Sequence, residues 1–207
     1  MANEHPELRE VIHRIRRGGQ RIRNILDDLL DFVHSSTRGG MRVHPVDIRM
    51  DELCTRVAAE VQAAFPGSRI QVQHEGDMQG RWDEHRVAQA LSNLMSNAIK
   101  YGVEDAPVQV TVDGGAADEV LVAVRNHGAD IPAETLESLF QPLVRGQEGD
   151  PTGASLGLGL FIVREIAAAH GGTVDVVSAN GGTTFRLSLP RHGDAISNAA
   201  VGRMRRT

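Results

Sequence analysis

The sequence predicts an α+β fold: a two-layer α/β sandwich with a mixed β-sheet and helices on one face, preceded by a long N-terminal amphipathic helix. Three observations lead to this prediction. Apolar residues recur every three or four positions in several long segments, which is the helical period. Short segments rich in valine stand between turn residues, as strands do. These segments are mixed along 207 residues, a length sufficient for one substantial domain.

The first expected element is a long helix over residues 8–33. Its apolar stripe is interrupted only at Gly18 and Gly19. Such a stripe must be covered, either by a helix from a second copy of the chain or another segment, or by folding back on its own domain. We therefore expect a homodimer through residues 8–33, with folding back as the alternative. Residues 35–45 contain serine, glycine and proline and indicate a linker or turn.

The remaining segments complete the predicted sandwich. Asp83 is placed to cap the N-terminus of one helix, and Gly171 and Gly172 to end another. The last two strands should form a hairpin around a pair of glycines. Helices are predicted over residues 50–65, 83–101 and 158–170, and strands over 69–75, 107–113, 119–126, 173–180 and 183–190.

Charge and hydropathy exclude several classes of protein. The net charge of -5 gives no general footprint for nucleic acid, and no apolar run is long enough to span a bilayer. Residues 1–17 lack the apolar core of a signal peptide. The single Cys54 cannot form an internal disulfide, and its place among helical apolar positions favours buried packing over reactivity. We expect a cytoplasmic chain without a membrane segment or a nucleic-acid partner.

A second stripe on the helix over 83–101 is polar. Asn93, Asn97, Lys100 and Tyr101 fall at positions i, i+4, i+7 and i+8, apart from the apolar face. A solvated helix face would explain polarity alone, but asparagine is a poor helix former, and such faces favour Glu, Lys or Arg. A carboxamide oxygen is a hard ligand suited to Mg²⁺, and a nearby lysine can meet phosphate oxygens. The stripe therefore suggests a site for a metal and a polyphosphate.

Glycine-rich segments indicate an anion site. In GASLGLGLFIV, three glycines (Gly153, Gly157 and Gly159) precede or open a helix, where backbone N–H groups and the helix dipole favour phosphate. Taken alone this pattern is weak, since such turns are often structural. VRNHGADIP and GGTTF could each be turn chemistry as well. All four patterns in this order carry much more weight.

Over residues 43–190 these motifs together resemble the ATP-binding catalytic domain of a sensor histidine kinase, the Bergerat fold shared with gyrase-type ATPases and certain chaperones. SNLMSNAIKYG is similar to the N box. The resemblance implies ATP and Mg²⁺ as cofactors, with Asn97 as the metal ligand, Asn93 supporting the site, Lys100 at the phosphates and Tyr101 against adenine.

Further residues are implied by the other boxes. NHGADIP resembles the first glycine box, LFQPLVRG the phenylalanine box, SLGLGLFIV the second glycine box and GGTTF the last one. Residues 145–155 would form a short ATP lid. The resemblance implies binding roles for Asn126, Gly128, Ile131, Phe140, Gly157, Leu158, Gly159, Leu160 and, through water, Thr183.

Three departures from the family pattern matter. Asn126 stands where the family has an aspartate that accepts from the adenine amino group, and the lost charge is expected to cost about 1 kcal/mol of affinity. Asp130 replaces a glycine, a mild conflict because aspartate tolerates left-handed backbone. No phosphoacceptor histidine box is recognisable. His5 lies in only a loosely similar context, and His13 and His34 read better as solvent-exposed.

The expected function is the catalytic part of a two-component sensor kinase. Asn93 stands where gyrase-type relatives have a general base, so hydrolysis should be slow. Phosphate would pass to a histidine on another segment or chain, for relay to a response regulator. A noncatalytic ATP-responsive module and an anti-sigma-type serine kinase are the alternatives. Expected domains are 1–40, a partial dimerisation hairpin and linker, 41–190, the catalytic domain, and 191–207, a disordered tail.

Overall fold

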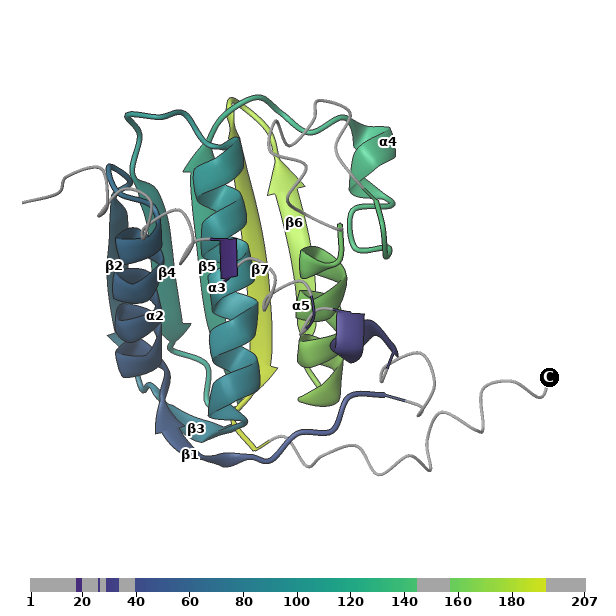
Figure 1. Cartoon of the computed structure of the whole chain (residues 1–207). Coiled ribbons are helices and arrows are strands. Elements are labelled where there is room, and N and C mark those ends of the chain that lie inside the picture. Colours follow the sequence, from purple (N-terminus) through teal and green to yellow (C-terminus); the bar gives the residue numbers. More distant parts are fainter. Residues whose placement is uncertain (1–17, 20–25, 27–28, 34–39, 145–156, 193–207) are drawn as a thin grey trace, which may run out of the picture.

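The computed structural model describes residues 18–19, 26, 29–33, 40–144 and 157–192. Three longer helices and one sheet dominate it (Figure 1). In chain order the elements are β1 (Val46–Arg49), α2 (Met50–Ala64), β2 (Ile70–Gly76), β3 (Gln79–Trp82), α3 (Glu84–Tyr101), β4 (Val108–Gly114), β5 (Glu119–His127), α4 (Ala133–Leu136), α5 (Gly159–Ala169), β6 (Thr173–Ser178) and β7 (Gly182–Pro190).

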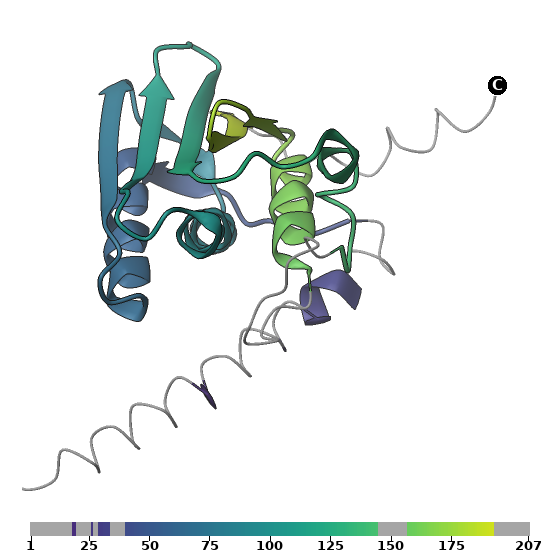
Figure 2. The ribbon, with the colours of Figure 1, turned by 90° about the horizontal axis from the view of Figure 1, so that it is seen from above.

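One mixed sheet organises the domain. Its five strands lie in the order β2-β4-β5-β7-β6, with β2 and β4 parallel and every other pair antiparallel. Figure 2 shows α2, α3 and α5 together on one side of this sheet. The predicted two-layer α/β sandwich with a mixed sheet and helices on one face is therefore confirmed.

The core lies between the helices and the sheet. Strand β5 alternates between its two faces, so that Val120, Val122 and Val124 are fully buried while the residues between them are not. Each such side chain contributes about 1.5–3 kcal/mol relative to an exposed one. The buried stripe of α3 consists of Val87, Ala90, Leu91, Leu94, Met95 and Ala98, as its period predicts.

Helix α3 begins and ends where its residues predict. The Asp83 side chain accepts a hydrogen bond from the Arg86 N–H over 3.1 Å, which confirms it as the N-cap. At the other end, a side chain at Gly102 would meet the Ala98 carbonyl oxygen at 2.5 Å. Glycine is therefore required where the chain leaves the helix.

The β6–β7 hairpin turns on Asn180 and Gly181, one position earlier than the predicted pair of glycines. Both residues have positive φ, 56° and 72°, the geometry of a type I′ turn. Backbone hydrogen bonds between Ala179 and Gly182 close the loop. The hairpin is confirmed, and its turn is the Asn-Gly type that matches strand twist.

Three features differ from the sequence expectations or extend them. Strands β1 and β3 form a separate antiparallel pair that was not predicted. Arg191, expected in a disordered tail, is only 5% exposed and donates to backbone carbonyl groups. Cys54 is buried as predicted, and burial raises the pKa of its thiol to about 12.

The predicted N-terminal helix lies largely outside the described residues. Residues 18–19, 26 and 29–33 are helical, and Asp31 and Phe32 contact α3 and α5 respectively. Among the helices that the structure describes, none combines the length and apolar character required to cross a membrane.

Candidate functional site

Two contacts fix how α3 and α5 lie together. At one end the Asp83 N–H donates to the ring of His170 over 3.0 Å, and midway the Asn93 side chain donates to the Gly159 carbonyl oxygen over 3.3 Å. The helices are therefore antiparallel, and α5 begins beside the middle of α3. Residues 94–101 of α3 continue past that point for roughly 12 Å. The first turn of α5 thus faces the space beside the last two turns of α3.

The polar stripe predicted on α3 borders this space. Asn93 and Asn97 are half-buried, while Lys100 and Tyr101 are exposed, the latter by 57%. A carbonyl oxygen can only accept, so the Asn93 amide nitrogen is directed to Gly159 and its oxygen points elsewhere. The stripe is not a uniformly solvated face.

The N-terminus of α5 has the features of an anion site. Gly157 has φ +70°, and a side chain there would meet the Val144 carbonyl oxygen at 2.6 Å. The Leu143 N–H donates to the Gly157 carbonyl over 3.1 Å, which ties the two flanks of residues 145–156 together. Helix α5 has no side-chain cap, so its first backbone N–H groups lack that partner.

The two leucines of this motif are oriented differently. Leu158 is 1% exposed and packs in the core, so only its backbone could face a ligand. Leu160 is half-buried. The predicted lid, 145–155, lies outside the described residues.

The loop after β5 is tied to the β6–β7 hairpin at three points. The Gly128 N–H donates to the Gly181 carbonyl, the Gly181 N–H to Asp130 Oδ1, and the Ile131 N–H to Ser178 Oγ, over 3.1, 2.9 and 2.9 Å. In Figure 1 this loop passes over the ends of β6 and β7 on its way to α4.

The departures at this loop have a structural account. Asp130 is not in left-handed backbone, contrary to the tolerance invoked for it; its carboxylate instead accepts the hairpin N–H. Gly128 is required for a different reason, because a side chain there would lie 2.7 Å from the Tyr101 carbonyl oxygen. The loop therefore packs directly on the end of α3.

Two buried polar side chains lie side by side on neighbouring strands. Asn126 of β5 and Thr183 of β7 are register partners and are 5% and 4% exposed. The Asn126 amide nitrogen donates to the His127 carbonyl over 3.3 Å, which leaves its oxygen turned the other way. The Thr183 hydroxyl shares a hydrogen bond of 2.8 Å with Ser178. This buried polar pair lies close to the end of α3 and is a candidate for hydrogen bonding to a ligand and determining its specificity.

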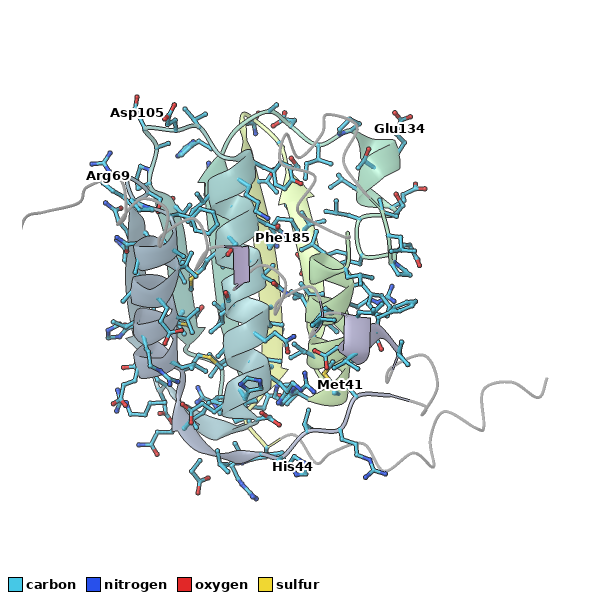
Figure 3. All side chains as sticks on the ribbon, in the orientation of Figure 1. Met41, His44, Arg69, Asp105, Glu134 and Phe185 are labelled. Atoms are coloured by element: carbon cyan, nitrogen blue, oxygen red, sulfur yellow. The ribbon has the colours of Figure 1, made fainter. Side chains whose placement is uncertain are left out.

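Phe140 anchors the segment that precedes the predicted lid. Its ring meets Phe185 edge to face, with centroids 6.3 Å apart. Figure 3 shows Phe185 projecting from the sheet toward the helices. This contact supports a packing role for Phe140, whose side chain has no polar group to offer a ligand.

Metal binding here would depend on a carboxamide. The described residues hold no cluster of three or more His, Cys, Asp or Glu side chains able to bind a metal on their own. Asn97 offers one neutral oxygen, which fits Mg²⁺ only when phosphate oxygens and water supply the remaining ligands. The residues therefore fit a metal that arrives with a polyphosphate.

A separate hollow of ≈ 850 Å³ lies at the opposite end of α3. Arg49, Glu84 and Arg191 are among the residues that line it, and none of the predicted site residues does. Arginine and carboxylate side chains both line it, so no single ligand charge is favoured. This hollow is therefore a weaker candidate for a functional site than the space beside the start of α5.

Sequence reasoning missed Ser178 and the contact made by Asp130. Both act between segments about 50 positions apart, where spacing carries no signal. The sequence offered one clue to Ser178: it stands two positions before the Asn-Gly turn, so its hydroxyl lies at the hairpin end beside Thr183.

The fold and the motifs define an ATP-binding domain of the Bergerat type. The chain belongs to the family of histidine kinase-, DNA gyrase B- and HSP90-like ATPases, which matches residues 82–193. It carries the catalytic ATP-binding domain homologous to those of two-component sensor kinases.

Relatives and a solved structure agree with this assignment. The chain is 31% identical to the bacteriophytochrome of Pseudomonas aeruginosa, over 87% of this chain and 25% of that protein. It is also 31% identical to the adaptive-response sensory kinase SasA of a Synechococcus strain, over 80% of this chain and 45% of the relative. Full-length ShkA in complex with AMPPNP superposes with a TM-score of 0.72 at 25% identity, covering 90% of this chain and 39% of that one. The chain thus spans less than half the length of these proteins.

Proposed function

We propose that this chain supplies the ATP-binding catalytic part of a protein-histidine kinase and that it acts in a two-component system. The observation that carries the proposal is the antiparallel packing of α3 and α5, fixed by the Asp83–His170 and Asn93–Gly159 contacts. It sets the uncapped start of α5 beside Asn93, while the part of α3 that carries Asn97 and Lys100 continues past this point, an arrangement that suits a metal-bound polyphosphate. We assign the catalytic domain to residues 41–192, two beyond the boundary expected from the sequence.

Each group of residues has a distinct task in the proposed site. Asn126 and Thr183 would read the base against Tyr101, while Lys100 and the backbone at 157–160 would meet the phosphates. Asn97 would hold Mg²⁺, which when bound neutralises phosphate charge. The nucleotide in the ShkA complex is that protein's ligand. The similarity of ShkA to this chain supports nucleotide binding here as well.

Transfer is favoured over hydrolysis by the chemistry of Asn93. A carboxamide cannot take a proton from water, and its nitrogen is directed to the Gly159 carbonyl oxygen. An imidazole nitrogen brought from another segment or chain would attack the γ-phosphorus, and the bond to the bridging oxygen would break, releasing ADP. The phosphoryl group would then pass to a response regulator. The name of SasA, a sensory kinase, supports this reading.

The N-terminal helix is proposed to serve dimerisation. Leu26, Leu29 and Leu30 are 54%, 45% and 54% exposed, as expected of a stripe that a second copy would cover. Asp31 and Phe32 contact the chain's own domain, so one helix could serve both surfaces. A cytoplasmic setting would give the site its ATP.

Label transfer tests the proposed activity. The chain is incubated with Mg²⁺ and γ-labelled ATP, together with the dimerisation hairpin of a homologous kinase as phosphoacceptor. We expect acid-labile, base-stable label on the hairpin, and none with Asn97→Ala. Nucleotide binding without any transfer would overturn the kinase assignment in favour of a noncatalytic ATP-responsive module. Label on serine would favour the anti-sigma type.

A further inference from the structure

The Ser178 hydroxyl contacts both the loop after β5 and Thr183 of β7, two parts of the proposed site that belong to different sequence motifs. On one side Ser178 Oγ accepts the backbone N–H of Ile131 over 2.9 Å. On the other it lies 2.8 Å from Thr183 Oγ1. Ser178 is half-buried at the end of β6, while Thr183 is 4% exposed. A single hydroxyl thus contacts both the loop that leads to α4 and a buried candidate base-reading residue.

The direction of the Ser178–Thr183 hydrogen bond decides whether Thr183 offers a ligand a donor or an acceptor. Each hydroxyl has one hydrogen to donate. The Ile131 N–H already donates to Ser178 Oγ, and among the described residues Thr183 Oγ1 is the further hydrogen-bond partner of that hydroxyl. Either hydroxyl could donate in this pair, because a hydroxyl oxygen has two lone pairs and can accept twice. When Ser178 donates to Thr183 Oγ1, all three groups donate in one direction and the Thr183 hydrogen is left to donate onward. Donation in one direction along the chain also strengthens each bond through polarisation.

With Ser178 as donor, Asn126 and Thr183 together present an acceptor next to a donor. Asn126 turns its oxygen away from the His127 carbonyl, which already takes the amide nitrogen. Thr183 is its cross-strand register partner, and such partners lie about 4.5–5.5 Å apart. A 6-aminopurine offers a donor at its amino group and an acceptor at the neighbouring ring nitrogen. A 6-oxopurine offers the reverse order, so it would oppose both groups.

We propose that Ser178 is a positioning residue for nucleobase selection: it donates to Thr183 Oγ1, leaves the Thr183 hydrogen to donate to the base, and so makes the site prefer 6-amino over 6-oxo purine nucleotides. This inference rests on the proposed function, because it requires that ATP binds in this site. Without the Ser178 hydroxyl, the Thr183 hydroxyl can turn and accept from the ring N–H of a 6-oxopurine.

The test compares ATP with inosine triphosphate, its 6-oxo counterpart, by titration calorimetry on the full chain. For Ser178→Ala we expect the preference for ATP to fall by up to about tenfold, the range of one neutral hydrogen bond. Ser178→Thr keeps the hydroxyl and should restore the preference. Ser188→Ala is the matched control, since it removes a serine hydroxyl that bonds Glu119 elsewhere on the hairpin.

The ratio of the two affinities separates positioning from mere structure. General destabilisation would weaken both nucleotides alike and leave the ratio unchanged. An unchanged ratio in a Ser178→Ala chain that binds both nucleotides overturns the inference and leaves the proposed function intact. Absence of ATP binding in the unaltered chain overturns the proposed function and the inference with it.

A second comparison covers the case in which Ser178→Ala does not fold. Ser178→Cys fills the same space with a weaker donor and acceptor, so the preference should fall part of the way. In a Thr183→Val background, Ser178→Cys should cause no further change in the ratio. A full effect of Ser178→Cys in that background would contradict a role through Thr183.

Discussion

The N–H of Asp83 donates to Nε2 of His170 over 3.0 Å, although the two residues are 87 positions apart. His170 is 1% exposed, and its Nδ1 lies 2.8 Å from the Ile166 carbonyl oxygen. A carbonyl only accepts, so Nδ1 carries the hydrogen and the ring is the neutral tautomer that can accept at Nε2. The contact joins the N-cap residue of α3 to the C-cap residue of α5 and needs an uncharged ring.

Acid should therefore weaken the fold through His170. Burial lowers the pKa of the ring below its ordinary 6.5, against the smaller raising effects of the Ile166 carbonyl and Asp83. The unfolded chain then binds the proton more readily, so this stability is fully present above about pH 6.5 and is lost as the pH falls through the lowered pKa. Each unit of lowering corresponds to about 1.4 kcal/mol.

Urea unfolding between pH 8 and pH 5 checks this expectation. His170→Gln removes the titrating ring, so its loss of stability on acidification should be smaller than that of the unaltered chain. His85, which is exposed on α3, provides the control as His85→Gln. Identical pH slopes for the unaltered chain and His170→Gln would show that the ring does not titrate as described.

Asp31 should hold the N-terminal helix against α3. Its carboxylate accepts hydrogen bonds from Arg86 Nη1 at 2.7 and 2.8 Å and from Gln89 at 2.8 Å. Charge-assisted bonds to a buried carboxylate are worth about 1.5–3 kcal/mol. Asp31→Asn should accelerate amide hydrogen exchange in residues 29–33 by about tenfold or more. Asp47→Asn, at a carboxylate that is 92% exposed, should leave that exchange unchanged.

Exchange that stays slow in Asp31→Asn would mean that Phe32 alone holds the segment. Its ring meets Phe161 edge to face, with centroids 5.6 Å apart.

Arg191 should be a major source of stability. Its guanidinium donates to the carbonyl oxygens of Gln79 at 2.6 Å, Asp77 at 2.7 Å and Gly114 at 2.8 Å. Arg191→Ala removes the guanidinium donor from all three carbonyl groups, of which Gly114 keeps the Asp77 N–H, and should cost about 3 kcal/mol or more in unfolding free energy. Arg186→Ala, on the exposed face of β7, is the matched control and should cost under about 0.5 kcal/mol. Equal unfolding midpoints for the two variants would contradict this role.

Asn126→Asp should exchange stability for affinity. The introduced carboxylate would face the His127 carbonyl, where the amide nitrogen now donates, so the melting temperature should fall. Charge assistance to the base amino group should tighten ATP by about fivefold, or about 1 kcal/mol. Differential scanning fluorimetry and calorimetry measure the two effects. Weaker ATP binding by the aspartate variant would show that the base does not meet this side chain.

Period and turn chemistry predicted most of the fold. Helix α3 was recognisable because its apolar stripe, its Asp83 cap and its terminal glycine all agree. Strands β1 and β3 were not, because each has four residues and their pairing joins residues 30 to 36 positions apart. Arg191 looked like a tail residue, since burial of an arginine depends on carbonyl groups supplied by distant turns.

The candidate site was predictable only where local sequence carries the signal. Asn97 and Gly157 were recognisable because a carboxamide on a helix and a glycine before one have local chemical reasons. The contacts made by Ser178 and Asp130 became visible only once the loop after β5 lay against the last hairpin. Roles assigned to these residues in nucleotide binding stay predictions.

Calorimetric titration of ATP, with and without Mg²⁺, tests the central claim most directly. The account predicts metal-dependent binding to the unaltered chain, weakened at least about tenfold in Asn97→Ala while Ser92→Ala on the same helix binds normally. Equal binding with and without Mg²⁺, unaffected by Asn97→Ala, or no binding at all, would contradict a metal-nucleotide site beside the start of α5.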